Sequence, residues 1–314
     1  MALSNSATLP SAWLAFELGV LRRLKFASIG LPFTGEPDLC LRLKRWKVRV
    51  AANDPMLWSF TKATALVENR LEQLTEEDFE LILDDAYVPR DKQDNQSITK
   101  WFNETDAWWF DNVRFNAERL ESPYKRALAL TLGMMVGDYV LSFDEHTRHL
   151  REPLSLSKVF RQLAGALPQL FDNALRNSAT NQDVRGFVAE RQHTDLLFLR
   201  LPPPIIKPET RRDSLVGWRE EWLQGGDHFW DEFDHASAGL LGAPVQSKQQ
   251  YLGFLEDLLQ RAAHLPYWAL MHVENGFISS EDVVDAVSRI RKIDAVYSKD
   301  FSDLLGVRAA IITA

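Results

Sequence analysis

Two segments of the 314-residue chain have residue types suited to binding a cofactor. The turn Phe33-Thr34-Gly35-Glu36-Pro37 follows a short apolar run and opens a helical pattern. A glycine turn there lets backbone amides approach a cofactor, and the helix N-terminus favours negative groups. Asp54 ends the next apolar run, about twenty residues later, where an acid can accept hydrogen bonds from ribose hydroxyls. Alone, these residues are more typical of a tight turn and a helix-capping aspartate than of a cofactor site.

A third segment, DLLFLRLPPPII at 195 to 206, reads as a buried strand that runs into three prolines. Pro202, Pro203 and Pro204 lack backbone N–H groups and fix φ at about −65°. A strand tip of such rigidity indicates that it holds something in place. We therefore treat it as a candidate site.

The elements that must position these segments follow from hydrophobic periodicity. A helix at 11–24, an apolar strand at 26–33, a helix at 38–46 and an alternating strand at 47–54 form a βαβ unit, which implies a parallel sheet. An amphipathic helix is predicted at 279–292. Further strands are predicted at 183–190, 195–200, 268–273 and 292–300.

The middle of the chain is helical in period, and Thr75 with Glu77 and Asp78 predicts a capped helix start. The sequence therefore predicts an α/β fold. A discontinuous Rossmann-like domain at 1–58 and 178–314 carries a helical insertion at 59–177.

Composition limits the function classes. The net charge is −8, so the basic excess of a stand-alone DNA binder is absent. The single cysteine, Cys40, excludes a disulfide framework and fits a reducing cytosol. We find neither a signal peptide nor an apolar run of about 20 residues, so we expect a cytoplasmic protein without a membrane segment.

One group of residues has the spacing of a metal site. His228, Asp231, Glu232 and His235 fall on adjacent turns of a helical pattern. They match no recognised ligand pattern, so a solvated acidic face is favoured and no metal is expected.

Taken together, the motifs resemble the D12 class of DNA N6-adenine methyltransferases, the group that includes Dam. That class has an F-x-G-x-G turn after the first strand, an N-D pair after the second, a helical insertion, a later D-V and a D-P-P-Y strand tip. Here Phe33 and Gly35 stand in the turn, Asn53-Asp54 is the acidic strand end, and Asp183-Val184 is the later acid. The strand tip is the segment from Arg200 to Pro204, namely Arg200, Leu201, Pro202, Pro203 and Pro204.

The resemblance implies S-adenosylmethionine as cofactor and a flipped adenine at the strand tip, where the acid accepts hydrogen bonds from the exocyclic amine. The chain departs from that pattern twice. Aligned without a gap, Arg200 replaces the acid; with one inserted residue, Leu201 does. Pro37 replaces the second glycine, and it has no N–H and cannot take positive φ. We therefore expect no catalytic residue to be intact, and S-adenosylmethionine only in an active enzyme.

The predicted function is that of a degenerate methyltransferase-like subunit, which supports an active adenine methyltransferase in stability or DNA engagement. Two alternatives stay open: a divergent but active S-adenosylmethionine-dependent enzyme, and a stand-alone DNA-binding or regulatory module. Aromatic residues in the insertion, Trp101, Trp108 and Trp109, are candidate contacts with the catalytic partner. DNA contact is expected to involve that partner.

Overall fold

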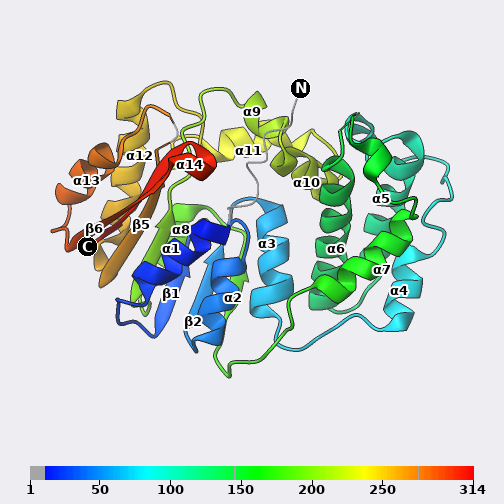
Figure 1. The fold of residues 1–314 in the computed structure, drawn as a ribbon, viewed down its shortest axis with the longest axis horizontal. Helices are drawn as coiled ribbons and strands as arrows, with labels where there is room; N and C mark the ends of the chain where they lie inside the picture. Colours follow the sequence, from blue (N-terminus) through cyan, green and yellow to red (C-terminus); the bar gives the residue numbers. More distant parts are fainter. Residues whose placement is uncertain (1–10, 145, 275) are drawn as a thin grey trace.

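The computed structural model describes residues 11–144, 146–274 and 276–314, and a seven-stranded sheet lies at its centre (Figure 1). The strand order is β3-β2-β1-β4-β5-β7-β6. The strands are β1 (Ser28–Leu31), β2 (Arg49–Asn53), β3 (Ser178–Thr180), β4 (Leu196–Arg200), β5 (Tyr267–Val273), β6 (Ala295–Phe301) and β7 (Val307–Thr313).

Strands β3, β2, β1, β4 and β5 pair in parallel, and β7 runs antiparallel between β5 and β6. The strand order reverses between β1 and β4, because β2 and β3 lie on one side of β1 while β4 and β5 lie on the other. In open α/β sheets, ligands bind outside the carboxyl ends of the strands at such a reversal. This mixed sheet confirms the predicted α/β, Rossmann-like fold.

Helices cover both faces of the sheet. Successive residues of a strand point to opposite faces, so Leu196 and Phe198 of β4 pack on one side and Leu197 and Leu199 on the other. One side is covered by α1 (Ser11–Leu21) and α2 (Asp38–Arg45). The opposite side is covered by α8 (Val184–Ala189), α12 (Lys248–Arg261) and α13 (Ser280–Ser288).

Between β2 and β3 the described chain forms only helices, which lie beside the sheet (Figure 1). They are α3 (Leu57–Ala63), a π-helical turn (Thr64–Glu68), α4 (Glu76–Leu83), a 3₁₀ turn (Gln96–Lys100), α5 (Glu104–Ala117), α6 (Pro123–Leu141), a 3₁₀ turn (Arg148–Leu150) and α7 (Leu156–Ala166). Thr75 caps α4 in a capping box with Asp78, which confirms the predicted helix start.

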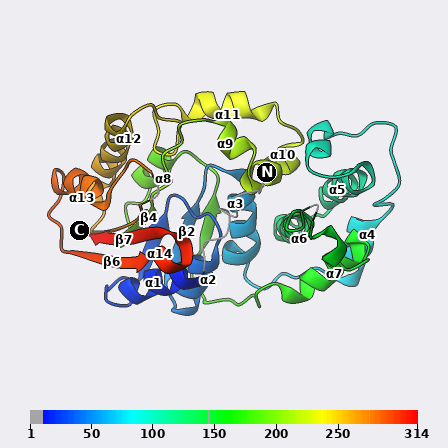
Figure 2. The same ribbon diagram turned by 45° about the horizontal axis from the view of Figure 1, so that its top comes forward.

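The later helices α9 (Glu209–Arg212), α10 (Leu215–Gln224) and α11 (Phe229–Ser237) span the top of the molecule between the sheet and the helical part (Figure 2). Trp218, Trp222 and Trp230 from these helices share one apolar core with α5, α6 and α7. From the sequence we expect these three tryptophans in the sheet domain, whereas in the structure they pack against the helical part. The boundaries at 58 and 178 stay a prediction. The remaining short elements are a 3₁₀ turn (Ala262–His264) and α14 (Ser302–Leu305).

The prediction of a strand at 183–190 was wrong. The Asp183 side chain accepts hydrogen bonds from the N–H groups of Arg185 and Gly186, and so caps α8, which occupies this stretch. The third strand is instead the short segment Ser178–Thr180. The C-terminal strand β7 was not predicted.

Candidate functional site

A cavity of about 940 Å³ opens at the carboxyl ends of β1, β2, β3 and β4, where the strand order reverses. The segments that follow these four strands form most of its wall, and α9, α10, α11 and the residues that follow α11 contribute the remainder. Its position therefore matches the ligand crevice of open α/β sheets. The structure brings every site residue predicted from the sequence to this cavity: Phe33, Gly35, Asp54, Asp183, Arg200, Leu201, Pro202, Pro203 and Pro204.

Asp54 holds the glycine turn in place from the end of β2. Gly35 has a positive φ of 58°, which favours glycine. Its N–H donates to Asp54 Oδ2 over 2.9 Å, and the N–H of Met56 donates to Asp54 Oδ1 over 3.0 Å. The Ser59 hydroxyl donates to the Gly35 carbonyl over 2.8 Å. The Asp54 carboxylate is therefore already hydrogen-bonded to the protein's own backbone.

Burial raises the pKa of Asp54 to about 6, although these backbone hydrogen bonds act in the opposite direction. The neighbouring residue Asn53 also bonds backbone groups of the segments that follow the strands. Its side-chain amide donates to the carbonyls of Pro32 and Gln182, each over 3.1 Å. The ends of β1, β2 and β3 are thereby fixed relative to one another.

Two amides of the glycine turn are occupied. The N–H of Thr34 donates to the Asn53 carbonyl over 2.9 Å, and the N–H of Gly35 is taken by Asp54. Pro37 has no N–H; it precedes α2 with a φ of −80°. Two of the amides that could approach a cofactor are bonded internally, and Pro37 offers none.

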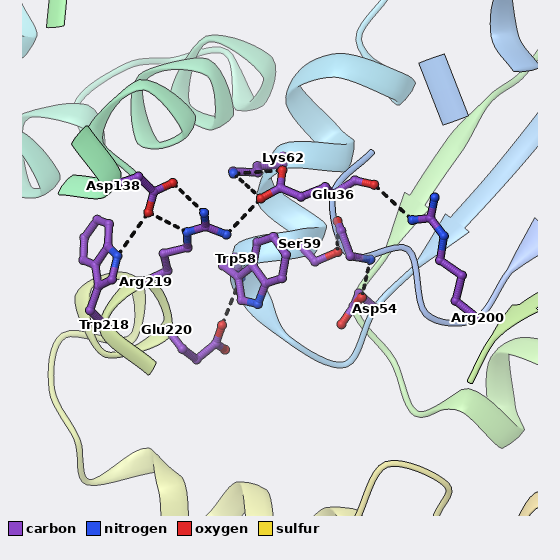
Figure 3. A network of polar contacts seen from close by, with 11 residues as sticks. Glu36, Asp54, Trp58, Ser59, Lys62, Asp138, Arg200, Trp218, Arg219 and Glu220 are labelled. Atoms are coloured by element: carbon purple, nitrogen blue, oxygen red, sulfur yellow. Dashed lines mark hydrogen bonds and ion pairs between the residues drawn. The ribbon is translucent and has the colours of Figure 1, made fainter. Parts of the chain in front are cut away.

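Arg200 fills the strand tip and turns toward the protein's own turn (Figure 3). Its Nε and Nη2 donate to the two carboxylate oxygens of Glu17, each over 2.8 Å. Its Nη1 donates to the carbonyl of Thr34 over 2.8 Å and to that of Glu36 over 3.3 Å. Glu17 on α1 is fully buried. Burial would lower the pKa of Arg200, but Glu17 outweighs it and raises that pKa.

Glu36 connects the same turn to the helical part (Figure 3). Its carboxylate pairs with Lys62 of α3 over 2.8 Å and with Arg219 of α10 over 2.9 Å. Arg219 also pairs with Asp138 of α6 and lies over the ring of Trp58. Burial acts to raise the pKa of Glu36, but the two cations outweigh it and lower that pKa. The negative charge of the Glu36 carboxylate is therefore balanced by Lys62 and Arg219.

Glu220 holds the start of α3. Its two carboxylate oxygens accept the N–H groups of Leu57 and Trp58 over 2.9 and 3.0 Å. Burial nevertheless raises the pKa of Glu220 to about 7. The sequence reading missed Glu17, Lys62, Asp138, Arg219 and Glu220. The one available signal was the run of consecutive charges in the otherwise apolar segment LVGWREEWLQ.

Of the remaining candidates, Asp183 is exposed, lines the cavity and caps α8. In the acidic segment near His228, Asp231 pairs with Arg212 over 3.3 Å. Within the described ranges, no three His, Cys, Asp or Glu side chains form a group that could hold a metal ion.

The three tryptophans of the insertion differ in burial. Trp109 is fully buried and its Nε1 donates to Ser157 over 2.9 Å, so the structure removes it from the surface available to a partner. Trp101 is half-buried and donates to Glu221 over 3.1 Å. Trp108 is half-buried too, and it stands outside the aromatic contacts of the core. It stays the strongest candidate contact of the three.

Comparison with known proteins agrees with this fold. No protein family model matches the chain. Over 285 residues the chain is 22% identical to the Type II methyltransferase M2.HphI of Haemophilus parahaemolyticus, across 82% of this chain and 79% of that protein. No helix within the described residues is long and apolar enough to cross a membrane. The chain is thus similar to a Type II methyltransferase along most of its length, with the cavity placed where the fold binds ligands.

Proposed function

We propose that this chain is a catalytically degenerate, methyltransferase-like subunit that supports an active DNA adenine methyltransferase in stability or DNA engagement. The similarity to a Type II methyltransferase supports the methyltransferase-like part. The observation that carries the degenerate part is the strand tip, where Arg200 is ion-paired with Glu17.

Methyl transfer to an exocyclic amine needs an acceptor at the place where the amine is held. Arg200 is a donor without acceptor capacity, and Leu201 is apolar. The carboxylates that line the cavity are Glu36, Asp54 and Asp183. Glu36 is neutralised by two cations, and Asp54 and Asp183 follow β2 and β3 rather than β4. No carboxylate is thus available at the strand tip.

The same geometry argues against tight cofactor binding. The N–H groups of Thr34 and Gly35 already donate to other residues of the chain, and Pro37 has no N–H. We therefore expect a dissociation constant for S-adenosylmethionine above about 1 mM. Isothermal titration calorimetry of the purified chain tests this expectation. Micromolar binding would contradict it and would favour the second candidate, a divergent active enzyme, which the retained cavity with Asp54 and Asp183 supports.

The partner is tested separately by co-purification with any adenine methyltransferase that a neighbouring gene encodes. Trp108→Ala should weaken that complex and should destabilise the isolated chain less than the loss of a core tryptophan does, because Trp108 is only partly buried. The matched variant Trp109→Ala should instead destabilise the chain by about 3 to 5 kcal/mol, because it empties a core position. A stable monomer that captures no methyltransferase would contradict the subunit role.

A further inference from the structure

The end of the sheet opposite the cavity carries a concentration of positive charge. Residues 22–49 run from the end of α1 through β1 and α2 to the start of β2, and they include eight lysine or arginine residues and two acidic ones. The rest of the chain has 28 lysine or arginine residues and 42 acidic ones. One segment of an otherwise acidic protein is therefore basic.

Six exposed cations of this segment form a surface that we call the basic face. The last turns of α1 and α2 and the turns that follow them lead into the amino ends of β1 and β2, at the lower edge of the molecule and away from α9 and α11 (Figure 1). The cavity lies at the carboxyl ends of the same strands. The residues of the basic face are Arg22, Arg23, Lys25, Arg42, Arg45 and Lys47.

Aromatic rings hold two of these arginines in place. The Arg22 guanidinium carbon lies 5.1 Å from the centroid of the Trp46 ring, so the end of α1 meets the end of α2. The Arg45 guanidinium carbon lies 5.7 Å from the centroid of the Phe171 ring. A guanidinium that stacks on a ring keeps its N–H groups for other acceptors. The two side chains are therefore oriented without using their hydrogen-bond donors on the rings.

The cations of the basic face are not paired with acids of the chain. In the stretches 11–144, 146–274 and 276–314, no carboxylate oxygen lies within 4.0 Å of their charged nitrogen atoms. Lys44 of the same segment is excluded from the basic face, because it is buried and donates to the Asn69 carbonyl over 2.8 Å. The six exposed charges are thus available to an external anion.

Four acids at the same end of the sheet act against an anion there. Two of them are paired, Asp172 with Arg70 over 3.5 Å and Glu190 with Arg191 over 3.6 Å. The others are Asp195, which precedes β4, and Asp294, which precedes the edge strand β6.

Asp195 is engaged by its neighbours. Its carboxylate accepts the N–H groups of Ala27 and Ser28, each over 2.8 Å. Burial raises the pKa of Asp195, but these hydrogen bonds and the charge of Arg49 outweigh it and lower that pKa. We therefore leave Arg49 out of the basic face. The C-terminal ends of α1 and α2 each add about half a negative charge. The six cations exceed these opposing charges, so the basic face stays positive.

We propose that the basic face binds the phosphate backbone of duplex DNA. Four of its six cations are arginines, whose fork of donors matches phosphate oxygens. Trp46 is half-buried and Arg22 lies over its ring, so this tryptophan is not an open platform for the unstacked bases of a single strand. The choice of DNA rests on the proposed function. The binding itself needs neither the cavity nor a partner chain.

The test measures binding of labelled DNA to the purified full-length chain by fluorescence anisotropy at several salt concentrations. A duplex of about 20 base pairs should bind with a dissociation constant of about 1 to 100 µM at about 50 mM salt, and its affinity should fall steeply as salt is added. Two unrelated duplex sequences should bind equally, because phosphate contacts carry no sequence information. Single-stranded DNA of the same length should bind more weakly.

A triple variant then locates the DNA. Arg22→Gln, Arg42→Gln and Arg45→Gln together should weaken duplex binding at least about tenfold at low salt. The slope of the logarithm of affinity against that of salt concentration should become less negative by up to about 3. Lys25→Gln alone, in the turn before β1, should change that slope by about 1 and provides a second measurement if the triple variant does not fold.

The matched control is the triple variant of Arg119→Gln, Arg289→Gln and Arg308→Gln. It lowers the net charge by the same amount, but these arginines pair with acids elsewhere on the molecule, so it should bind DNA nearly as the wild type does.

The proposal is overturned if the wild-type chain does not bind duplex DNA at low salt, if single-stranded DNA binds more tightly, or if the two triple variants lose affinity equally. A basic-face variant that binds DNA as the wild type does but no longer co-purifies with a methyltransferase would also overturn it, and would assign the face to an acidic protein partner. These outcomes are independent of whether the chain transfers methyl groups, so they distinguish this proposal from the proposed loss of catalysis.

Discussion

At the residue scale, Arg200 shows how a single side chain changes the role of a strand tip. The Arg200 guanidinium bonds both carboxylate oxygens of a fully buried Glu17 and two carbonyls of the glycine turn. The side chain that replaces the expected acid therefore joins α1, β4 and the turn. In this way Arg200 stabilises the structure at the strand tip.

Replacing Arg200 by the acid of the related motif should therefore damage the fold without creating activity. Arg200→Asp leaves Glu17 buried without a counter-ion and adds a second carboxylate, so we expect a loss of about 3 to 5 kcal/mol in the free energy of unfolding. Urea unfolding measures this loss. Arg200→Lys, which keeps the charge but not the paired geometry, should lose less. Wild-type stability in Arg200→Asp would show that the ion pair does not hold the tip.

The raised pKa of Glu220 should make the stability of the native state depend on pH. The pKa of its carboxyl is about 7 in the native state and 4.5 in the unfolded chain. Between these values the native state binds more protons than the unfolded state, so raising the pH through this window destabilises the native state. In Glu220→Gln this contribution is absent.

Between pH 4.5 and pH 8, the free energy of unfolding of the wild type should therefore fall by up to about 3 kcal/mol more than that of Glu220→Gln. Asp54, whose pKa is about 6, contributes with the same sign in both proteins, so the comparison isolates the contribution of Glu220 together with its interaction with Asp54. Unfolding titrations of the two proteins at both pH values provide the measurement. A difference that does not change with pH would mean that the pKa of Glu220 is the same in the native state and in the unfolded chain.

The sequence could predict those site residues that lie in short motifs. Phe33, Gly35 and Asp54 follow apolar strands at the spacing of a βαβ unit, and the structure places them at one cavity. The polar partners could not be found in this way. Glu36 and Arg219 are 183 positions apart, as are Glu17 and Arg200. Only the packing of α1 and α10 against the turn makes these pairs.

At the element scale, α10 packs on α6 through two glycines. A Cβ atom on Gly133 would lie 2.2 Å from Trp222 Cη2, and one on Gly137 would lie 2.2 Å from Trp218 Cη2. Both tryptophans are fully buried. The glycines therefore form the surface on which the two indole rings rest.

Gly133→Ala and Gly137→Ala should each destabilise the chain by about 1 to 3 kcal/mol, because the rings must move within a packed core. Gly165→Ala in α7 is the matched control. A Cβ there meets no atom within 4 Å, so helix propensity should make this change neutral or stabilising by up to about 1 kcal/mol. Thermal unfolding compares the three variants. Equal behaviour of all three would contradict the close packing of α6 and α10.

The sequence predicted elements well where apolar periodicity was long or capped, as for β1, β2, β4, β5, β6 and α13. It failed at 183–190, where the predicted strand is the helix α8, which the Asp183 side chain caps. It also missed β7. That strand is last in the chain yet pairs between β5 and β6, so its place depends on tertiary pairing.

At the scale of the whole molecule, the ion-paired network around Glu36 and Arg219 joins three parts: the turn after β1, the helical insertion and α10 (Figure 3). Glu220 adds a second link, from α10 to the start of α3. The ligand cavity lies beside these links, since Glu36 and Trp58 line it. The fold is thus kept intact around a cavity whose expected chemical groups are replaced, which is the arrangement proposed for a supporting subunit.

The most direct test of the proposed loss of catalysis is methyl transfer by the purified chain alone. Unmethylated DNA is incubated with the chain and S-adenosylmethionine, and N6-methyladenine is quantified by mass spectrometry, with an active adenine methyltransferase as control. We predict no N6-methyladenine above background, because the strand tip carries Arg200, paired with Glu17, in place of an acid. Formation of N6-methyladenine that depends on the wild-type chain and on S-adenosylmethionine would contradict the account.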